Sequence, residues 1–171
     1  MSRQKLTGAD LGSLMVVLAS KDGAARQKAR KSLVALGKLA VSSLTQALQN
    51  SEVDHVRWEA VKTLNAIGDA RAIPQLVKAL EDGDPDVAWL AAEGLRKFKK
   101  AAWSPLLRVL IKRGAGSALL RQGAHHVLRN QREVGFNDLL ATLLKALEPG
   151  SVPVSTTVAA YAILKRMKAR A

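Results

Sequence analysis

A helical pattern that recurs every 31 residues constrains this chain more than any other feature of its sequence. Residues 28–37 align with residues 59–68, and Ala, Leu, Leu or Ile, and Gly coincide at equivalent positions. A further shift of 31 residues brings Ala91 and Leu95 into the same alignment. Within each copy the apolar residues are three or four apart, which places them on one face of an α-helix. The sequence therefore predicts stacked helical repeats.

A second helix is expected after each of these helices. Val41 begins an apolar series whose equivalents are Ile73, Trp103 and Phe136, at intervals of 30 to 33 residues. We call helices with the Ala29 pattern first-type helices and those with the Val41 pattern second-type helices. The chain is expected to open on a second-type helix and to close on a first-type helix, so two half-repeats flank the complete pairs.

The composition agrees with an all-α fold. The chain of 171 residues contains 28 Ala and 26 Leu, and aromatic residues make up only 4%. Ala and Leu are strong helix formers, whereas strands favour β-branched and aromatic residues. Gly37 and Gly68 stand where left-handed helix caps are expected. We predict a right-handed α-solenoid of antiparallel helix pairs, with about ten helices.

The predicted domain organisation is a single repeat domain over residues 1–171. Its expected parts are a half-repeat at 6–20, repeats at 22–50, 53–82, 84–113 and 117–147, and a terminal helix at 152–168.

Several classes of protein are disfavoured by the composition. No apolar run approaches the ~20 residues of a transmembrane helix, and no signal peptide is recognisable at the N-terminus. Cysteine is absent, which removes disulfides, cysteine-bound zinc and thiol catalysis. The expected location is the cytoplasm.

The best-preserved repeat resembles a known family. Residues 56–64, 66–69 and 72–80 together resemble a HEAT-like repeat, closest to the short type named after phycobilisome lyases. The resemblance is strongest over residues 53–111 and stays in register on both sides. It implies a superhelix whose second-type helices line the concave face. Such repeats occur in scaffolds, lyases, hydroxylases and DNA glycosylases, so the resemblance leaves the function open.

The residues predict no catalytic site, cofactor or metal. The deoxyhypusine hydroxylase branch of this family holds iron with His-Glu pairs, and the matching place here reads Trp58-Glu59. His125 and His126 are adjacent, so they diverge by about 100° on a helix and do not form an i, i+4 metal pair. If the chain were a DNA glycosylase, Asp138 would be the candidate catalytic carboxylate. An Asp in the first turn of a helix is also favoured by the helix dipole, and this structural role is the better explanation of Asp138.

Two tryptophans are candidates for partner binding. Trp58 and Trp89 occupy the same repeat position, and Trp58 lies about 200° around the helix from the core residue Val56. Both rings are thus expected to point away from the core. They form either an aromatic patch for a partner or rings that lie in grooves between helices, beside the side chain of Arg57 or Lys62.

The charge is strongly basic but unevenly distributed. The net charge is +13, divided as +6 over residues 1–50, −1 over 51–100, +4 over 101–150 and +4 over 151–171. The bases expected on second-type helices, and so on the concave face, are Arg71, Lys78, Arg108, Lys112, Arg113 and Lys145. The bases expected on the outer, first-type helices are Arg26, Lys28, Arg30, Lys31, Arg96, Lys97, Lys99 and Lys100.

These features favour a non-enzymatic binding or scaffold module that presents a curved basic surface to an acidic protein partner or assembly. A first alternative is nucleic-acid binding through the basic faces, although the concave bases lack the neighbouring aromatic residues that favour stacking on single strands. A second alternative, implied by the resemblance, is a bilin lyase-like or isomerase-like subunit. The sequence does not identify the partner, the binding face or the oligomeric state.

Overall fold

The computed structural model describes residues 8–113 and 116–170, and all regular structure in these ranges is helical. Ten α-helices and three 3-10 helices occur there, without any β-strand. The predicted all-α fold of paired helices is therefore confirmed. Residues 6 and 7, where the first half-repeat is expected to begin, lie outside the described residues. The chain divides into two compact units, Met1–Gln75 and Leu76–Ala171, which we call the N-terminal unit and the C-terminal unit.

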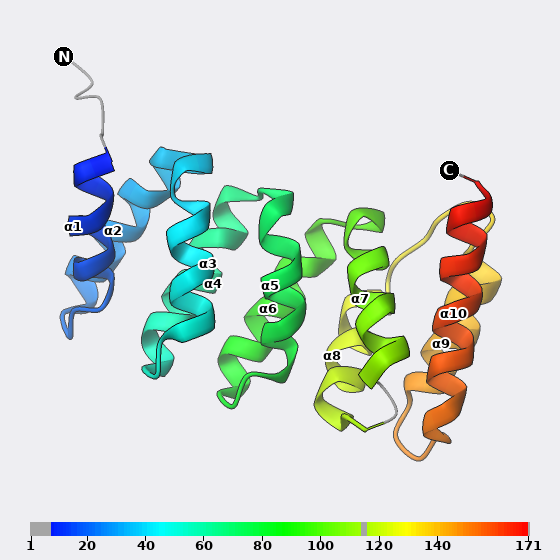
Figure 1. Ribbon diagram of the computed structural model, residues 1–171. Coiled ribbons are helices and arrows are strands. Elements are labelled where there is room, and N and C mark those ends of the chain that lie inside the picture. The colour runs from blue at the N-terminus through cyan, green and yellow to red at the C-terminus, as the bar shows by residue number, and fades with distance from the viewer. Residues whose placement is uncertain (1–7, 114–115, 171) are drawn as a thin grey trace. The chain divides into compact units, whose positions relative to one another are not determined.

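The N-terminal unit consists of helices that run up and down in alternation (Figure 1). The elements are α1 (Gly8–Leu18), α2 (Gly23–Leu36), η1 (Gly37–Leu39), α3 (Val41–Asn50), α4 (Asp54–Ile67), η2 (Ala70–Ala72) and the start of α5 (Ile73–Lys78). Within the unit α1 packs against α2 and α3 packs against α4, so each pair buries its apolar faces together. The two first-type helices α2 and α4 also contact each other, which joins one repeat to the next.

The C-terminal unit continues the alternation. The elements are the end of α5, η3 (Ala79–Glu81), α6 (Pro85–Lys97), α7 (Lys100–Arg113), α8 (Ala118–Leu128), α9 (Asn137–Leu147) and α10 (Pro153–Ala169). The first-type helices α6 and α8 pack side by side, and η3 contacts both of them.

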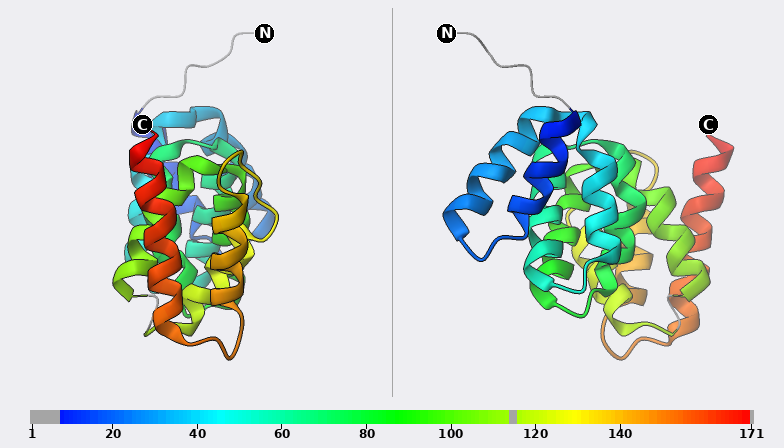
Figure 2. Two further views of the ribbon diagram at one scale, coloured as in Figure 1. Left: turned by 90° about the vertical axis from the view of Figure 1, so that its right-hand side faces the viewer. Right: turned by 60° about the vertical axis from the view of Figure 1, so that its left-hand side comes forward.

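The order of helices at the end of the chain differs from the sequence expectation. The second-type helix α7 packs chiefly against α10, whereas α9 contacts α8 and α10 (Figure 2). The expectation that α9 continues the row of second-type helices and that α10 closes the row of first-type helices is therefore wrong. Helix α10 buries the small residues Ala159 and Ala160 in its packing against α7 and α9, and small residues let helices approach closely.

The residues predicted to stack the repeats are buried. All six are at most 2% exposed: Ala29, Leu33, Ala60, Leu64, Ala91 and Leu95. Trp103, expected in the core, is 1% exposed and meets Phe136 edge-on with the ring centroids 5.8 Å apart. This geometry is favourable for aromatic pairs.

Capping residues mark several of the helix ends. Asp84 caps the N-terminus of α6 by accepting hydrogen bonds from the backbone N–H groups of Asp86 and Val87. Gly68 follows α4 in the left-handed conformation predicted for it, with φ 69° and ψ 26°. Gly37 follows α2 with a positive φ of 56° but a ψ of −124°, so the left-handed cap predicted there is not formed, although a side chain would still be strained.

Replacing Gly68 with Ala tests this cap. We expect Gly68→Ala to lower the free energy of unfolding by about 1–2 kcal/mol, because an L-residue is disfavoured at positive φ. Gly12→Ala is the matched control: Gly12 lies inside α1 with open space around it, so the same change should stabilise by about 0.5–1 kcal/mol. Urea unfolding followed by circular dichroism measures both, and equal effects would contradict the assignment.

Candidate functional site

An apolar groove lies between α6, α8 and the turn before α6, all in the C-terminal unit. Trp89 on α6 and Leu119 on α8 contribute to its walls and are 56% and 54% exposed. The groove has a volume of about 460 Å³. Asp82 and Asp86 line its end near the N-terminus of α6. Two large apolar side chains so exposed in one groove are typical of a contact surface.

Gly123 allows α8 to come close to the wall of this groove. A Cβ atom built on Gly123 would lie 3.0 Å from Cδ2 and 3.1 Å from Cβ of Leu80 in η3. These distances are tighter than ordinary side-chain contacts, so a larger residue would push α8 away from η3.

A basic pocket lies at the other end of α6. Its walls are Glu93, Arg96, Lys97, Lys99, Asn130, Gln131 and Arg132, and its volume is about 460 Å³. Four bases and one carboxylate give these walls a formal charge of +3, and the two amides add neutral hydrogen-bonding groups. The Gln131 amide donates to the Arg96 carbonyl over 3.2 Å, which ties the turn after α8 to the end of α6. This pocket is suited to carboxylates or other anions.

The groove and the pocket meet at a hydrogen-bonded pair of side chains, Glu93 on α6 and His126 on α8. His126 lines the groove, Glu93 lines the pocket, and the His126 Nε2 atom donates to the Glu93 carboxylate. Arg96 also donates to this carboxylate over 2.7 Å. His126 and Arg96 together hold the pKa of Glu93 below its usual range, despite the opposing effect of burial. The Trp89 ring lies 6.3 Å from the His126 ring.

The two tryptophans singled out in the sequence have different surroundings. Trp58, on α4 of the N-terminal unit, is half-buried, and the Lys62 ammonium lies 4.1 Å from the centre of its ring. This cation–π contact matches the packing alternative for Trp58. Trp89 lines the groove between α6 and α8 and is 56% exposed, so partner binding by its ring stays a prediction.

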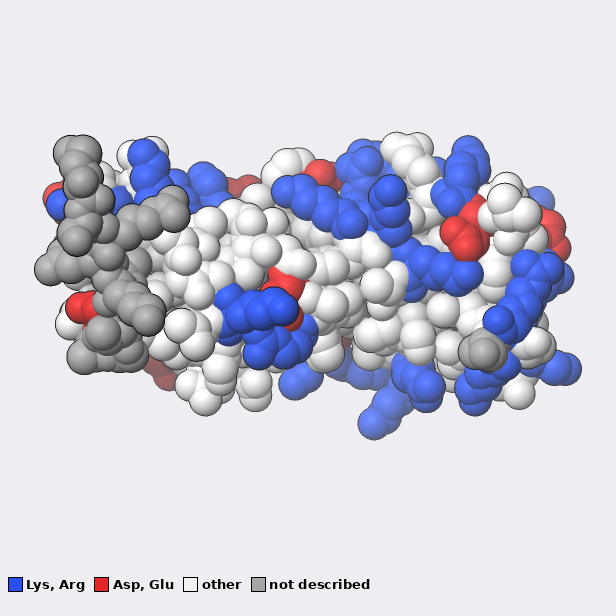
Figure 3. All heavy atoms as spheres, turned by 90° about the horizontal axis from the view of Figure 1, so that it is seen from above, with Lys and Arg blue, Asp and Glu red and all other residues white. Residues whose placement is uncertain are grey.

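The bases predicted on second-type helices are exposed side chains: Arg71, Lys78, Arg108, Lys112, Arg113 and Lys145. One face of the molecule shows more Lys and Arg than Asp and Glu (Figure 3). The predicted stripe of bases is interrupted in the C-terminal unit. Helix α9, which carries Lys145, is expected beside α7, but α10 occupies that place.

Two of these bases are engaged by acidic neighbours. Arg71 lies in η2 and pairs with Asp69 over 2.9 Å, which lowers the pKa of Asp69 to about 2. Arg113 pairs with Glu81 over 2.9 Å. Both bases are thereby less available to an anionic partner than unpaired lysines are.

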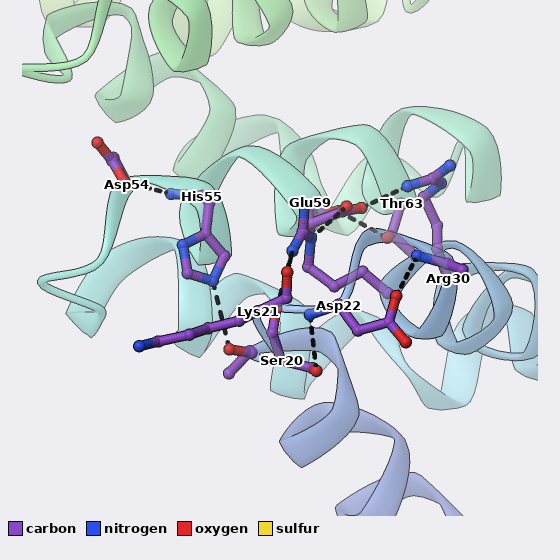
Figure 4. A network of polar contacts seen from close by, with 11 residues as sticks. Ser20, Lys21, Asp22, Arg30, Asp54, His55, Glu59 and Thr63 are labelled. Atoms are coloured by element: carbon purple, nitrogen blue, oxygen red, sulfur yellow. Dashed lines mark hydrogen bonds and ion pairs between the residues drawn. The ribbon is translucent and has the colours of Figure 1, made fainter.

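A buried carboxylate joins two repeats in the N-terminal unit (Figure 4). The Glu59 side chain on α4 is 4% exposed and pairs with Arg26 over 3.3 Å and with Arg30, both on α2. The Thr63 hydroxyl donates to the Glu59 carbonyl over 2.6 Å. Arg26 also donates to the carbonyl of Ser20. The cluster is internally paired and serves packing between α2 and α4.

Most of the site in the C-terminal unit is not predicted from the sequence. Arg96, Lys97 and Lys99 are expected there on outer helices without a ligand, and the structure places Lys99 in the turn after α6. A signal was present, because Trp89, Glu93 and Lys97 are spaced i, i+4, i+8 and so share one face of α6. The facing wall is on α8, where His126 lies 33 residues, or about one repeat length, after Glu93.

Other kinds of site are not formed by the described residues. In residues 8–113 and 116–170 no three His, Cys, Asp or Glu side chains gather in a way that would hold a metal ion. Over the same ranges, no helix combines the length and the apolar character that crossing a bilayer requires.

Comparison with known proteins identifies the repeats. Residues 12–88 match the family model of HEAT repeats, which confirms the resemblance over this range. A comparison with curated proteins gives no match. Among solved structures, the chain is similar to the complex of CpcE and CpcF of phycocyanin lyase from a Nostoc species, with a TM-score of 0.60 and 24% identity. The similarity covers 90% of this chain and 99% of that chain, and it supports the helical-repeat fold.

Replacing Glu59 with glutamine tests whether its ion pairs with Arg26 and Arg30 hold α2 and α4 together. We expect Glu59→Gln to lower the free energy of unfolding by about 2–3 kcal/mol, because two arginines lose their shared buried partner. Glu133→Gln is the control: its pair with Lys100 is 36% and 45% exposed, so its loss should cost less than about 1 kcal/mol. If urea unfolding shows similar losses of stability for Glu59→Gln and Glu133→Gln, the Glu59 ion pairs do not hold α2 and α4 together.

The Glu93 pair predicts a pH dependence. A carboxylate whose pKa is lowered by folding stabilises the protein above its ordinary pKa, 4.5 for Glu, and loses this contribution as the pH falls through the folded value. Glu93→Gln lacks that contribution at every pH. The difference in urea midpoint between the wild type and Glu93→Gln should therefore shrink from about pH 5.5 to about pH 3. A difference that stays constant over this range would contradict the pairing.

Proposed function

We propose that this protein is a non-enzymatic helical-repeat module that binds an acidic segment of a protein partner through the basic pocket of its C-terminal unit. The observation that carries the proposal is the pocket itself, in which Arg96, Lys97, Lys99 and Arg132 line one concave surface with a single carboxylate. Helical repeats commonly offer such rigid surfaces to partners.

The availability of the bases supports this pocket over the stripe predicted on second-type helices. Lys97 and Lys99 are exposed, and Arg132 donates to the neighbouring Gln131 carbonyl. By contrast, Arg71 and Arg113 have carboxylate partners. An incoming carboxylate at the pocket thus meets the positive charges of Lys97, Lys99 and Arg132, while Arg96 already pairs with Glu93.

The solved complex supports a protein partner in general terms. The similar structure is a complex of two proteins, CpcE and CpcF. Its name also makes a lyase-like subunit the second candidate function for this chain, with fold similarity as the supporting observation. Transfer of a bilin to an acceptor protein in the presence of this chain would favour that second candidate.

Charge reversal at the pocket tests the first proposal. We expect Lys97→Glu with Lys99→Glu to weaken binding of a capped, glutamate-rich peptide by about tenfold, measured by fluorescence anisotropy near physiological salt. The control is Lys165→Glu with Lys168→Glu on α10, which lowers the net charge equally and should change the affinity by less than about twofold.

The controls separate the alternatives. Equal weakening by both double variants would mean that binding depends on total charge and not on the pocket. Tighter binding of a short DNA duplex than of the peptide, with a steep salt dependence, would favour nucleic acid as the partner.

A further inference from the structure

The groove and the basic pocket lie end to end along the same two helices. Trp89, Glu93 and Lys97 follow one face of α6, while Leu119 and His126 line the opposing wall on α8. The Glu93–His126 pair stands where the two hollows meet. A ligand that lies along α6 therefore passes an apolar surface, the hydrogen-bonded Glu93–His126 pair and a basic surface in that order.

The charge order along this track is directional. Asp82 and Asp86 border the groove at the start of α6, and Arg96, Lys97 and Lys99 surround the pocket at its end. Carboxylates of a ligand are favoured at the pocket and repelled at the far end of the groove. Trp89 and Leu119 between these ends are suited to an apolar side chain.

We propose that the groove and the pocket form one bipartite site for a short segment of a partner protein, which places an apolar side chain between Trp89 and Leu119 and carboxylates among Arg96, Lys97 and Lys99. This inference rests on the proposed function and adds the apolar anchor, the order and the spacing. Lys97 follows Trp89 by eight positions, which is about 12 Å along the helix. An extended segment rises about 3.3 Å per residue, so the anchor and the first carboxylate are about four residues apart.

A partner of different sequence is favoured over a second copy of this chain. The chain carries a net charge of +13, so two copies repel each other. A segment with carboxylates instead complements the pocket and leaves the apolar groove to its anchor. The order of charges also disfavours a uniformly acidic segment, because its carboxylates would meet Asp82 and Asp86.

Two capped peptides test the bipartite site. The anchored peptide contains a leucine, three serine or glycine residues and then three glutamates, and the anchorless peptide has serine in place of the leucine. We expect the wild-type protein to bind the anchored peptide about tenfold more tightly. Trp89→Ala should remove this advantage while leaving the anchorless peptide unaffected, and Leu119→Ser should do the same. Such a cycle isolates the contact between the groove and the leucine.

The remaining arms distinguish the two proposals. Lys97→Glu with Lys99→Glu should weaken both peptides, and Trp58→Ala is the control for loss of a tryptophan. If Trp89→Ala weakens both peptides equally or neither, the bipartite site is overturned while the basic pocket stands. If charge reversal at the pocket has no effect on either peptide, the proposed function fails as well.

Three further results would also overturn the bipartite site. The first is equal binding of a peptide with lysines in place of the glutamates. The second is an unchanged affinity when the leucine directly precedes the glutamates. The third is a concentration-dependent dimer that Trp89→Ala abolishes, which would assign the groove to a second copy. Circular dichroism establishes that each variant is folded before binding is measured.

Discussion

Each helix pair in this protein depends on its neighbour to bury its apolar residues. In the N-terminal unit α2 and α4 close over Ala29, Leu33 and Leu64, and in the C-terminal unit α6 and α8 pack side by side. A pair of short amphipathic helices has too little apolar surface to be stable alone, so the contact between repeats supplies much of the stability. Polar side chains reinforce the same contacts, since Glu59 and Glu93 each pair with a residue 29 to 33 positions away.

Much of the fold could be predicted because its determinants are local and periodic. The spacing of Ala and Leu identifies the buried face of each helix. Gly68 marks a helix end through a positive φ that few other residues adopt, and Asp84 marks one through the backbone N–H groups that its side chain caps. The position of α10 could not be predicted in this way. It buries Ala160 and Ile163 but exposes Val154, Val158 and Tyr161, so its sequence has no single apolar face that identifies its neighbour.

The candidate site was harder to predict for a different reason. Its walls come from α6 and α8, and a sequence gives the face of each helix but not which faces oppose each other. The tryptophans illustrate the difference: Trp58 and Trp89 are equivalent in the repeat, yet Lys62 covers the first and the second is open in a groove. Equivalent positions in a repeat thus acquire different environments from residues that are not themselves conserved between copies.

The ion pairs of Glu59 with Arg26 and Arg30 limit where the length of a repeat can change. The Glu59 carboxylate meets Arg26 and Arg30 only if α2 and α4 keep their rotation about their own axes and their position relative to each other. One residue inserted within either helix rotates every later side chain by about 100°, which turns Glu59 or its arginines away and leaves a charge buried without a partner. Insertions in the turns between helices leave the rotation of each helix unchanged, so we expect them to disturb this pairing less. The buried ion pairs of Glu59 are therefore expected to confine length variation in this part of the chain to its loops.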